Sequence, residues 1–495
     1  MAERRTPRIS LLSRADCERV HEATLDLMRR VGVRFLPEEA LSVFRQAGFE
    51  ITDGNIVRFQ PDDVEAALET VPKSVVRRGL SPGFDVEIGG GTLTMGAGSV
   101  PLYVIEAPSY ERRPATLDDL VKFTWLVDGL ENLAIGNGVV LPHDVPGSVM
   151  HVIWNLNAAV NTSKPSCCWY ATTPQMAEDG LAIMSAAAGG TDNLREMKTW
   201  AITICPEGAL TWGPSTYGLL EMAKYDVPIE VLPMPMSGSM CPVTMAGTLV
   251  HANMEAISAI VLAQLLRPGC PIIYAPSYGG SMDMRLAAHC FGTPETALQG
   301  AAFAQLGHWY GFPTNMMAGL SDAQVPDEQA AYEKMMVVLL PALAGADCIT
   351  QAGGLLDFGL SASYEQMVID DEICSQVLNL VTGFDFDDET LATAAIEQVG
   401  HGGSYLMHEH TLEHFRQALW MPRLSDRTTY DQWAEAGSKD VVAQAAHRAE
   451  QILAEHRPVG ITGSSVQAAG SVARSICQRE GVDSACVEQV MAAQG

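Results

Sequence analysis

The chain has 495 residues and a formal net charge of −28 at pH 7, with 47% hydrophobic and 18% charged residues. A sequence this apolar can build a large core, which excludes global disorder. The negative charge argues against binding to nucleic acid or to an anionic membrane, and it favours basic or cationic ligands and partners. We therefore expect a folded acidic protein that contacts neither nucleic acid nor membrane.

Cysteine usage and the first residues of the chain both indicate a reducing compartment. The eleven cysteines are scattered, without a CxxC pair or a short disulfide framework. The opening MAERRTPRIS is charged and lacks the apolar stretch of a signal peptide. Longer apolar stretches are interrupted by Asn, Glu or Gly, so no transmembrane helix is expected. These features predict a cytoplasmic protein.

Residues 1–91 are predicted to form an N-terminal helical cap. Helical apolar spacing runs from Ser13 to Val31, near 38–47 and near 61–71, and the sequence then becomes rich in strand and turn residues. No regular alternation of strand and helix is present in this part. We expect these elements to pack around a larger body that follows them.

Residues 92–384 alternate between short apolar strands and amphipathic helices. The strands are expected at Thr92–Gly96, Leu133–Val140, Ser166–Ala171, Thr199–Cys205, Glu230–Pro235, Pro271–Pro276, Pro313–Ala318 and Cys348–Ala352. The helices are expected near 116–129, 147–161, 174–188, 214–225, 247–265, 294–310, 326–343 and 365–381, with Thr116, Thr173 and Thr293 as N-caps. Strict alternation implies a parallel sheet, and near-continuous apolar strands imply burial on both faces. The predicted fold is α/β, a (β/α)8 TIM barrel.

Residues 385–495 are predicted to form a C-terminal helical extension packed on the barrel. The clearest helix there is AHRAEQILAEHRP, within a charged segment. The tail after Pro458 is rich in small residues, and we expect it to be mobile or to form an oligomer contact. This gives three expected regions, at 1–91, 92–384 and 385–495.

The loops after the strands are where a barrel of this kind carries its function. They are rich in aromatic, Met, Gly and neutral polar residues and poor in Lys and Arg. An aromatic ring face attracts a cation, including a quaternary ammonium without hydrogen-bond donors. The candidates for such a cage are Tyr103, Trp169, Tyr170, Trp212 and Tyr278. Ordinary packing at the barrel rim is the alternative interpretation for each of them.

The motifs predict neither a metal centre nor a nucleophilic triad. The densest group of possible ligands, His401, His408, Glu409, His410 and His414, lacks HExxH and lies outside the eight-strand span. A capping or interface segment is the favoured interpretation of this group. GxSxG is absent, and no GxGxxG opens a helix after a strand. We expect no bound metal in this chain and disfavour a nicotinamide enzyme.

Four long stretches carry a family resemblance. They are SDAQVPDEQAAYEKMMVVLLPALAGAD, GGLLDFGLSASYEQMVIDDE, VGHGGSYLMHEHTLEHFR and PRLSDRTTYDQWAEAGSKD. Through them the chain resembles the trimethylamine:corrinoid methyltransferases and their relatives that lack pyrrolysine, which include glycine betaine methyltransferases. The resemblance implies a TIM barrel, a methylamine donor and methyl transfer to cobalamin, a corrinoid, carried by a separate corrinoid protein.

The chain departs from the trimethylamine enzymes at one position. Those enzymes carry pyrrolysine near the end of the seventh strand, whereas this chain has NMMAGLSDAQ, with the equivalent position at or next to Gly319. Pyrrolysine is thought to hold or activate the methylamine in those relatives. The resemblance therefore implies a permanently quaternary donor, such as glycine betaine or a related betaine, rather than trimethylamine.

Roles follow for residues at the strand ends. We expect Asp322 and Gln351 to be catalytic, with Asp322 balancing the donor's charge or orienting Gln324. An alternative role for Asp322 is a carboxylate that starts a helix turn. The expected substrate-binding residues are Tyr103, Asn137, His143, Trp169, Tyr278, Gln324 and Thr350.

Two other functions remain open on the residues alone. One is a lyase or isomerase acting on a small polar metabolite, with Asp322, Glu333 or His143 as acid and base. The other is a quaternary-amine binder or assembly subunit without catalysis. Methyl transfer is preferred over both because of the resemblance, and a homo-oligomer is expected.

Overall fold

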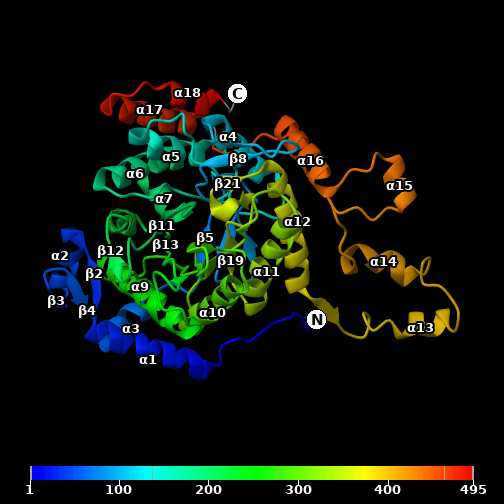
Figure 1. Ribbon diagram of the computed structural model, residues 1–495, viewed down its shortest axis with the longest axis horizontal. Helices are drawn as coiled ribbons and strands as arrows, with labels where there is room; N and C mark the ends of the chain where they lie inside the picture. Colours follow the sequence, from blue (N-terminus) through cyan, green and yellow to red (C-terminus); the bar gives the residue numbers. More distant parts are fainter. Residues whose placement is uncertain (1–2, 137, 278, 462, 493–495) are drawn as a thin grey trace.

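The computed structural model describes residues 3–136, 138–277, 279–461 and 463–492. Short strands and long helices alternate through its centre, so the fold is α/β (Figure 1). The central strands are β7 (Thr94–Met95), β10 (Ser166–Cys167), β11 (Trp200–Ile204), β13 (Ile229–Val231), β15 (Ile272–Tyr274), β18 (Asn315–Met317) and β19 (Cys348–Thr350). Every predicted strand window except Leu133–Val140 overlaps one of them.

The central strands pair in parallel, one with the next, and form a series that we call the circuit. Strands β10, β11, β13 and β15 pair in that order, and β18, β19 and β7 form a second parallel group. Parallel bridges link Tyr274 of β15 to the residue before β18, and Gly96 after β7 to Ile135. The backbone N–H of Gly136 then donates to the carbonyl of Pro165, just before β10, at 2.9 Å. The predicted strand at Leu133–Val140 is thus reduced to these few backbone contacts.

A helix follows each step of the circuit, as the sequence pattern predicts. These are α4 (Leu117–Gly129), α5 (Met150–Val160), α6 (Pro174–Ala188), α8 (Thr216–Met222), α9 (Met245–Leu266), α10 (Pro294–Tyr310), α11 (Glu328–Ala344) and α12 (Tyr364–Thr382). The hydroxyls of Thr116, Thr173 and Thr293 each accept a backbone N–H of the helix that follows, which confirms the three predicted N-caps. The short α7 (Thr191–Met197) was not predicted.

Helix α9 is long and apolar enough to cross a membrane by length and composition alone. Helices in the core of a folded protein can have the same length and apolar composition. In this structure 78% of its most apolar window is buried against other parts of the chain. We therefore assign α9 to the core.

Several N-terminal elements pack against α9, and the β5–β6 pair lies beside β7. The N-terminal elements are β1 (Glu3–Arg5), α1 (Arg14–Arg30), β2 (Val33–Phe35), α2 (Glu38–Gln46), β3 (Glu50–Thr52), β4 (Ile56–Arg58), α3 (Pro61–Glu69), β5 (Val75–Arg77) and β6 (Val86–Ile88). Helices α1 and α3 contact α9, and β5 pairs with β6. At the end of β5, Arg77 is fully buried and reaches the backbone beneath β10 and β11.

The tail after Pro458 is helical and packed, which corrects the expectation of a mobile segment. It forms α17 (Ser464–Arg479) and α18 (Ala485–Ala492) beside α5 (Figure 1). The Arg479 guanidinium donates to both oxygens of Asp179 on α6, at 2.8 and 2.7 Å. Helix α16 (Val441–Glu455) packs between α4 and α12. Small residues at helical spacing let these helices lie close to the body.

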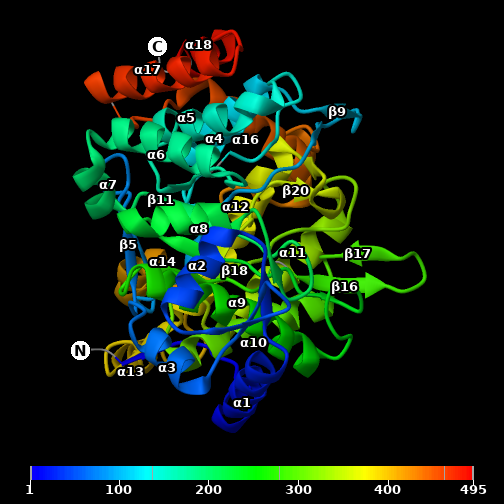
Figure 2. The ribbon, with the colours of Figure 1, turned by 90° about the vertical axis from the view of Figure 1, so that its left-hand side faces the viewer.

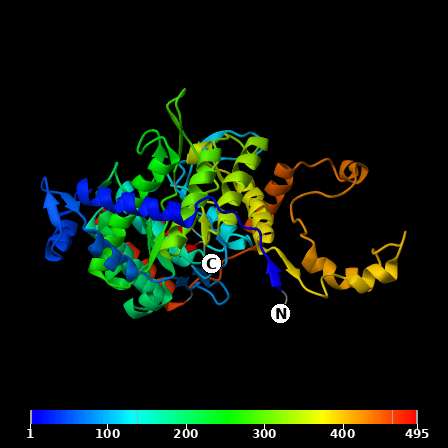
Figure 3. The same cartoon turned by 90° about the horizontal axis from the view of Figure 1, so that it is seen from below.

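The segment between α12 and α16 projects from the body. It begins with β22 (Phe384–Phe386), which pairs with β1, and continues through α13 (Thr393–Val399), α14 (Glu409–Ala418) and α15 (Tyr430–Glu435). Figures 1 and 3 show these three helices extending away from the rest of the chain. Neither α14 nor α15 has a buried residue. This segment therefore adds little to the core.

Two small β layers lie beyond the carboxyl ends of the central strands. One contains β8 (Tyr103–Ile105), β9 (Arg112–Pro114), β20 (Leu355–Leu356) and β21 (Ser361–Ala362). The other contains β14 (Met236–Ser237), β16 (Gly280–Asp283) and β17 (Ala288–Cys290). Figure 2 shows the β16–β17 hairpin and β9 projecting on the same side of the molecule. The first layer is tied to α4 and α12 through the Asp119 carboxylate.

Asp119 accepts hydrogen bonds from Arg113 at 2.7 and 2.8 Å, from the Thr116 hydroxyl at 2.7 Å and from the Tyr364 hydroxyl at 2.8 Å. Burial raises the pKa of Asp119, but these hydrogen bonds outweigh it and bring the pKa to about 2. A carboxyl with a lowered pKa stabilises the fold above its unfolded-state pKa, and this contribution is lost as the pH falls toward 2.

We therefore predict that Asp119→Asn lowers the free energy of unfolding by about 2 kcal/mol at pH 7. The difference from the unsubstituted protein should shrink as the pH falls from about 4 toward 2. Urea unfolding at several pH values measures it. Asp118→Asn, on the same helix turn but exposed, is the control and should change little. A difference for Asp119→Asn that stays constant with pH would contradict the assignment.

Candidate active site

A cavity of about 460 Å³ lies at the carboxyl ends of the central strands. Its walls come from the residues that end or follow β7, β10, β11, β13, β18 and β19. Cavities at this edge of a parallel α/β fold are the usual place for substrate and catalytic groups. Among the lining residues, all of which lie in described parts of the chain, there is no Lys, Arg or His.

Aromatic rings form one wall of the cavity. Trp169 and Tyr170 follow β10 directly, and Trp154 of α5 stands behind them. The Trp154 and Trp169 rings meet edge to face with centroids 5.2 Å apart. The backbone N–H of Trp169 donates to the Asn155 side chain at 2.7 Å, which fixes the turn that carries the ring. This wall offers ring faces to a cation.

Glu230 supplies the one carboxylate of the lining and is not among the predicted site residues. It lies within β13, is 1% exposed, and accepts from the Thr203 hydroxyl at 2.9 Å through one oxygen. Its other oxygen, Oε1, has no hydrogen-bond partner among the described residues. A single acid inside an otherwise apolar strand was the available signal, because such a charge is costly to bury without a purpose.

Gln351 and Thr350 line the cavity at the end of β19, as the sequence analysis placed them. Gln351 has a φ of 62°, the left-handed region that side-chain-bearing residues adopt at a cost. Its Oε1 is buried and without a hydrogen-bond partner in the described chain. The Thr350 hydroxyl, in contrast, is already paired with Asn315 of β18 at 3.0 and 3.1 Å. Gln351 therefore has an unused acceptor atom, whereas the Thr350 hydroxyl already donates its one proton to Asn315.

Asp322, one of the two residues predicted to be catalytic, is not among the residues that line the cavity. Its carboxylate accepts backbone N–H groups from Phe291 at 2.8 Å and Gly292 at 3.2 Å, where β17 leads into α10. Burial raises the pKa of Asp322 from its ordinary value. The loop after β18 turns this side chain toward α10 and away from the strand ends. Asp322 thus fixes a loop.

Three predicted binding residues, Tyr103, His143 and Gln324, do not line the cavity. Tyr103 is in the β8–β9 layer, where the Arg112 guanidinium covers its ring at 4.3 Å and His143 lies 5.8 Å from it. Gln324 donates to the backbone carbonyl of Asp322 at 2.9 Å. Trp212 is fully buried and packs in the core. The remaining two, Asn137 and Tyr278, lie outside the described residues.

Three cysteines border the cavity but are poor nucleophiles. Burial raises the pKa of Cys167 and of Cys205 to about 12, and it also raises the pKa of Cys168. A thiol reacts as its thiolate, which is scarce at neutral pH under these conditions. These side chains therefore serve as small apolar surface.

Among the described residues no group of three or more His, Cys, Asp or Glu side chains is placed to hold a metal. In the histidine-rich segment, the rings of His410 and His414 lie 4.4 Å apart on the projecting α14. His408 contacts Gln398 instead of a third ligand. The segment is far along the chain from the cavity walls, and nothing in the cavity depends on it.

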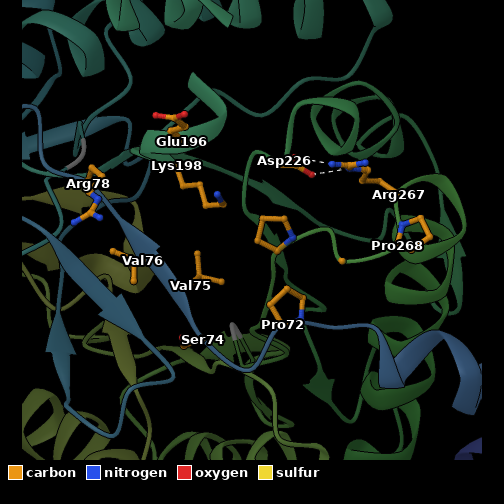
Figure 4. A pocket seen from close by; sticks show the side chains of 12 residues that line it. Pro72, Ser74, Val75, Val76, Arg78, Glu196, Lys198, Asp226, Arg267 and Pro268 are labelled. Carbon is orange, nitrogen blue, oxygen red and sulfur yellow. Dashed lines mark hydrogen bonds and ion pairs between the residues drawn. The ribbon is translucent and has the colours of Figure 1, made fainter. Parts of the chain in front are cut away.

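A second hollow, of about 400 Å³, lies at the opposite end of the central strands (Figure 4). It is bordered by β5 and by residues that precede β11 and β15, including Lys198. Its charges are largely paired: Arg267 donates to Asp226 at 2.9 and 3.1 Å, as Figure 4 shows. The amino ends of barrel-type strands serve stability more than chemistry. The aromatic-walled cavity is thus the candidate active site.

Gly319 lies just after β18, in the loop next to Gln351. Its φ is 108°, and a Cβ built there would lie 2.7 Å from Cα of Ala352 and 2.8 Å from the carbonyl oxygen of Gln351. The Lys334 ammonium, itself buried, donates to the Gly319 carbonyl at 2.6 Å and to Asp370 at 2.9 Å. The backbone here is held in place and has no room for a side chain.

Comparison with known proteins supports an enzyme that acts on small molecules. Residues 1–468 match the family described as trimethylamine methyltransferase (MTTB), and the chain belongs to this family of methyltransferases. It is 32% identical over 455 residues to a glycine betaine methyltransferase of Desulfitobacterium hafniense, covering 91% of this chain and 94% of that one. It is also 32% identical over 462 residues to the trimethylamine methyltransferase MttB of Methanosarcina barkeri, covering 91% of each.

Among solved structures, the monomethylamine methyltransferase MtmB of Methanosarcina barkeri covers 90% of this chain and 98% of its own. The TM-score is 0.46 and the sequence identity 12%. A likeness of this size adds nothing to the assignment of the site, which rests on the geometry above and on the family match.

We predict that Gly319→Ala is destabilising beyond the cost of its backbone conformation. The added methyl meets backbone atoms that are fixed, so the free energy of unfolding should fall by about 1–3 kcal/mol more than in a matched control. The control is Gly437→Ala, because Gly437 has a φ of 99° and open space around its Cβ position. Denaturant unfolding of both variants measures the difference. Equal losses would show that the loop at Gly319 has room to adjust.

Proposed function

We propose that this chain transfers a methyl group from a quaternary ammonium carboxylate, of the glycine betaine kind, to a corrinoid carried by a partner protein. We further propose that the strand circuit is a closed (β/α)8 barrel, with residues 1–91 and helices α16, α17 and α18 packed around it, and that the cavity is its active site. The observation that carries the proposal is a cavity lined by aromatic rings and one buried carboxylate, with no Lys, Arg or His among its lining residues.

The lining suits a quaternary ammonium group. Ring faces of Trp169 and Tyr170 and the carboxylate of Glu230 all favour positive charge. A quaternary nitrogen has no N–H donors, so moving it from water into this cavity leaves no hydrogen bond unmade. A primary or secondary ammonium would need acceptors for each N–H, which the apolar thiol, Met and Leu surfaces do not supply.

The chemistry needs little from acid or base groups. A quaternary nitrogen already has a neutral amine as its leaving group, and the corrinoid supplies the cobalt nucleophile that takes the methyl. The protein binds the donor, excludes water and points one methyl toward the cavity mouth. A lining without Lys, Arg or His, with thiols held protonated, agrees with such a task.

Gly319 supports a quaternary donor over trimethylamine. The family resemblance puts the pyrrolysine of the trimethylamine enzymes at or next to this position. Here a glycine occupies it, and even a Cβ would collide with the backbone of Ala352. The loop is thus built without the long side chain that is thought to hold a methylamine, so the donor must carry its positive charge permanently.

Gln351 is the best-placed group for the donor's carboxylate. Its amide group lines the cavity at the end of β19. The amide nitrogen can donate to a carboxylate, a hydrogen bond worth about 1 kcal/mol or more. Gln351 lines the cavity and has a left-handed backbone conformation, and residues in such costly conformations often lie at functional sites.

A donor screen tests the proposal. The purified chain is mixed with reduced cobalamin and with glycine betaine, carnitine, choline, tetramethylammonium or trimethylamine, and methylcobalamin formation is followed by its absorption spectrum. We predict turnover of at least one quaternary ammonium carboxylate and none of trimethylamine. Turnover of trimethylamine without activity on any betaine would contradict the proposal.

We also predict that Trp169→Ala weakens binding of that donor by about 1–2 kcal/mol, because the ring face is lost, whereas Trp169→Phe keeps most of the affinity. Trp125→Ala is the control, since this tryptophan lies on α4 under Arg457 and away from the cavity. Titration calorimetry measures the dissociation constants. An unchanged affinity in Trp169→Ala would show that the aromatic wall does not contribute to donor binding.

A further inference from the structure

Beneath the cavity, a buried arginine stands behind Glu230. Arg77 ends β5, outside the central circuit, and its side chain is fully buried. Its Nη2 donates to the backbone carbonyls of Ser166 and, at 3.1 Å, Thr199, at the amino ends of β10 and β11. Its Nη1 lies 3.7 Å from Oε1 of Glu230. The guanidinium is therefore fixed on the side of Glu230 that faces away from the cavity.

The hydrogen bonding of the Arg77–Glu230 pair is incomplete, which points to a role of this pair in ligand binding. Oε1 of Glu230 and Nη1 and Nε of Arg77 have no hydrogen-bond partner in the described chain. Burying two charges costs more than an apolar pair of the same size, and such a pair is weak support for stability. The cost is offset if the charges act on a ligand, and Glu230 is the member that lines the cavity.

We propose that Arg77 is a positioning residue that holds the Glu230 carboxylate at the cavity floor and cancels its charge, so that the cavity selects a zwitterionic donor over a bare cation. This inference rests on the proposed function, whose donor it restricts. Glu230 still attracts the nearby onium group, because Arg77 lies behind it. The floor as a whole is neutral, however, so a complex with a zwitterion is neutral too.

The charge balance sets the direction of selectivity. A bare cation bound over the neutral pair leaves one uncompensated positive charge in a low-dielectric cavity, which is unfavourable. Without Arg77 the balance reverses, because a cation then neutralises Glu230, whereas a zwitterion leaves the carboxylate's charge uncompensated. Relative to the unsubstituted protein, the preference of the cavity would then shift from glycine betaine toward tetramethylammonium.

Titration calorimetry with glycine betaine and tetramethylammonium tests this inference without requiring methyl transfer. In Arg77→Met we expect the ratio of the two affinities to shift toward tetramethylammonium by about tenfold or more. Arg77→Lys keeps the charge while changing the contacts to Ser166 and Thr199, so it should keep most of the original preference. Arg78→Met, at the adjacent exposed residue paired with Asp85, is the matched control and should leave the ratio unchanged.

Removal of one buried charge could prevent folding, so a second comparison is needed. Arg77→Met in the Glu230→Gln background removes both charges together, which is tolerated better than an unpaired charge. The floor is neutral both in this double variant and in the unsubstituted protein, so the ratio of the two affinities should agree between these proteins within about threefold, whereas a floor that was negative before substitution would give a shift toward glycine betaine. With the unsubstituted protein binding glycine betaine, the inference would be overturned by an unchanged ratio in Arg77→Met, or by a shift of about tenfold or more toward glycine betaine in the double variant. Binding of neither probe to the unsubstituted protein would instead count against the proposed function.

Discussion

The parallel pairing of the central strands is the constraint on which the site depends. Because the strands run in one direction, their carboxyl ends meet at one edge, and residues as far apart in sequence as Gly98 and Gln351 line one cavity. Buried polar contacts then hold the loops at that edge. The clearest is Lys334, which ties the carbonyl of Gly319 to Asp370, while Asp370 accepts the backbone N–H of Gly354. Two successive strand-end loops are thereby fixed beside Gln351.

The cavity's chemistry follows from what surrounds this edge. It has ring faces and one carboxylate but no cationic side chain, so its potential favours positive charge. Arg77 enters from the opposite end, through a strand that does not belong to the circuit, and faces Glu230 from below. The N-terminal segment thus contributes to the electrostatics of the cavity as well as to the core. In the proposed arrangement, Glu230 attracts the positively charged group of the donor, while Arg77 keeps the net charge of the buried pair at zero. A zwitterionic donor suits both conditions.

The alternation of strands and helices was readable from sequence because apolar periodicity marks both elements clearly, and the threonine N-caps mark helix starts. Trp169, Thr350 and Gln351 were found because they lie at or just beyond the carboxyl ends of strands. Glu230 was missed because it lies within an apolar strand, where pairing with Arg77 from a distant segment depends on the folded structure. Asp322 also follows a strand, but its loop turns it toward the backbone of Phe291 and Gly292.

The tail shows a different limit. Its small and polar residues gave no strong signal, yet Val466, Ala469, Ala473 and Ile476 recur at helical spacing and are buried when α17 packs on α6. Small residues allow close helix packing only if a partner surface is present, and the sequence does not show where that surface lies. The helical structure of the tail therefore depends on its tertiary contacts with the rest of the chain.

The most direct test is a crystal structure of the protein with glycine betaine, which stays intact when no corrinoid is present to accept its methyl. The account predicts the trimethylammonium group within about 6 Å of the Trp169 ring centroid, next to Glu230, with the donor's carboxylate directed to Gln351. Glycine betaine bound in the reverse orientation, or bound in the hollow beside Lys198 instead of the aromatic-walled cavity, would contradict it.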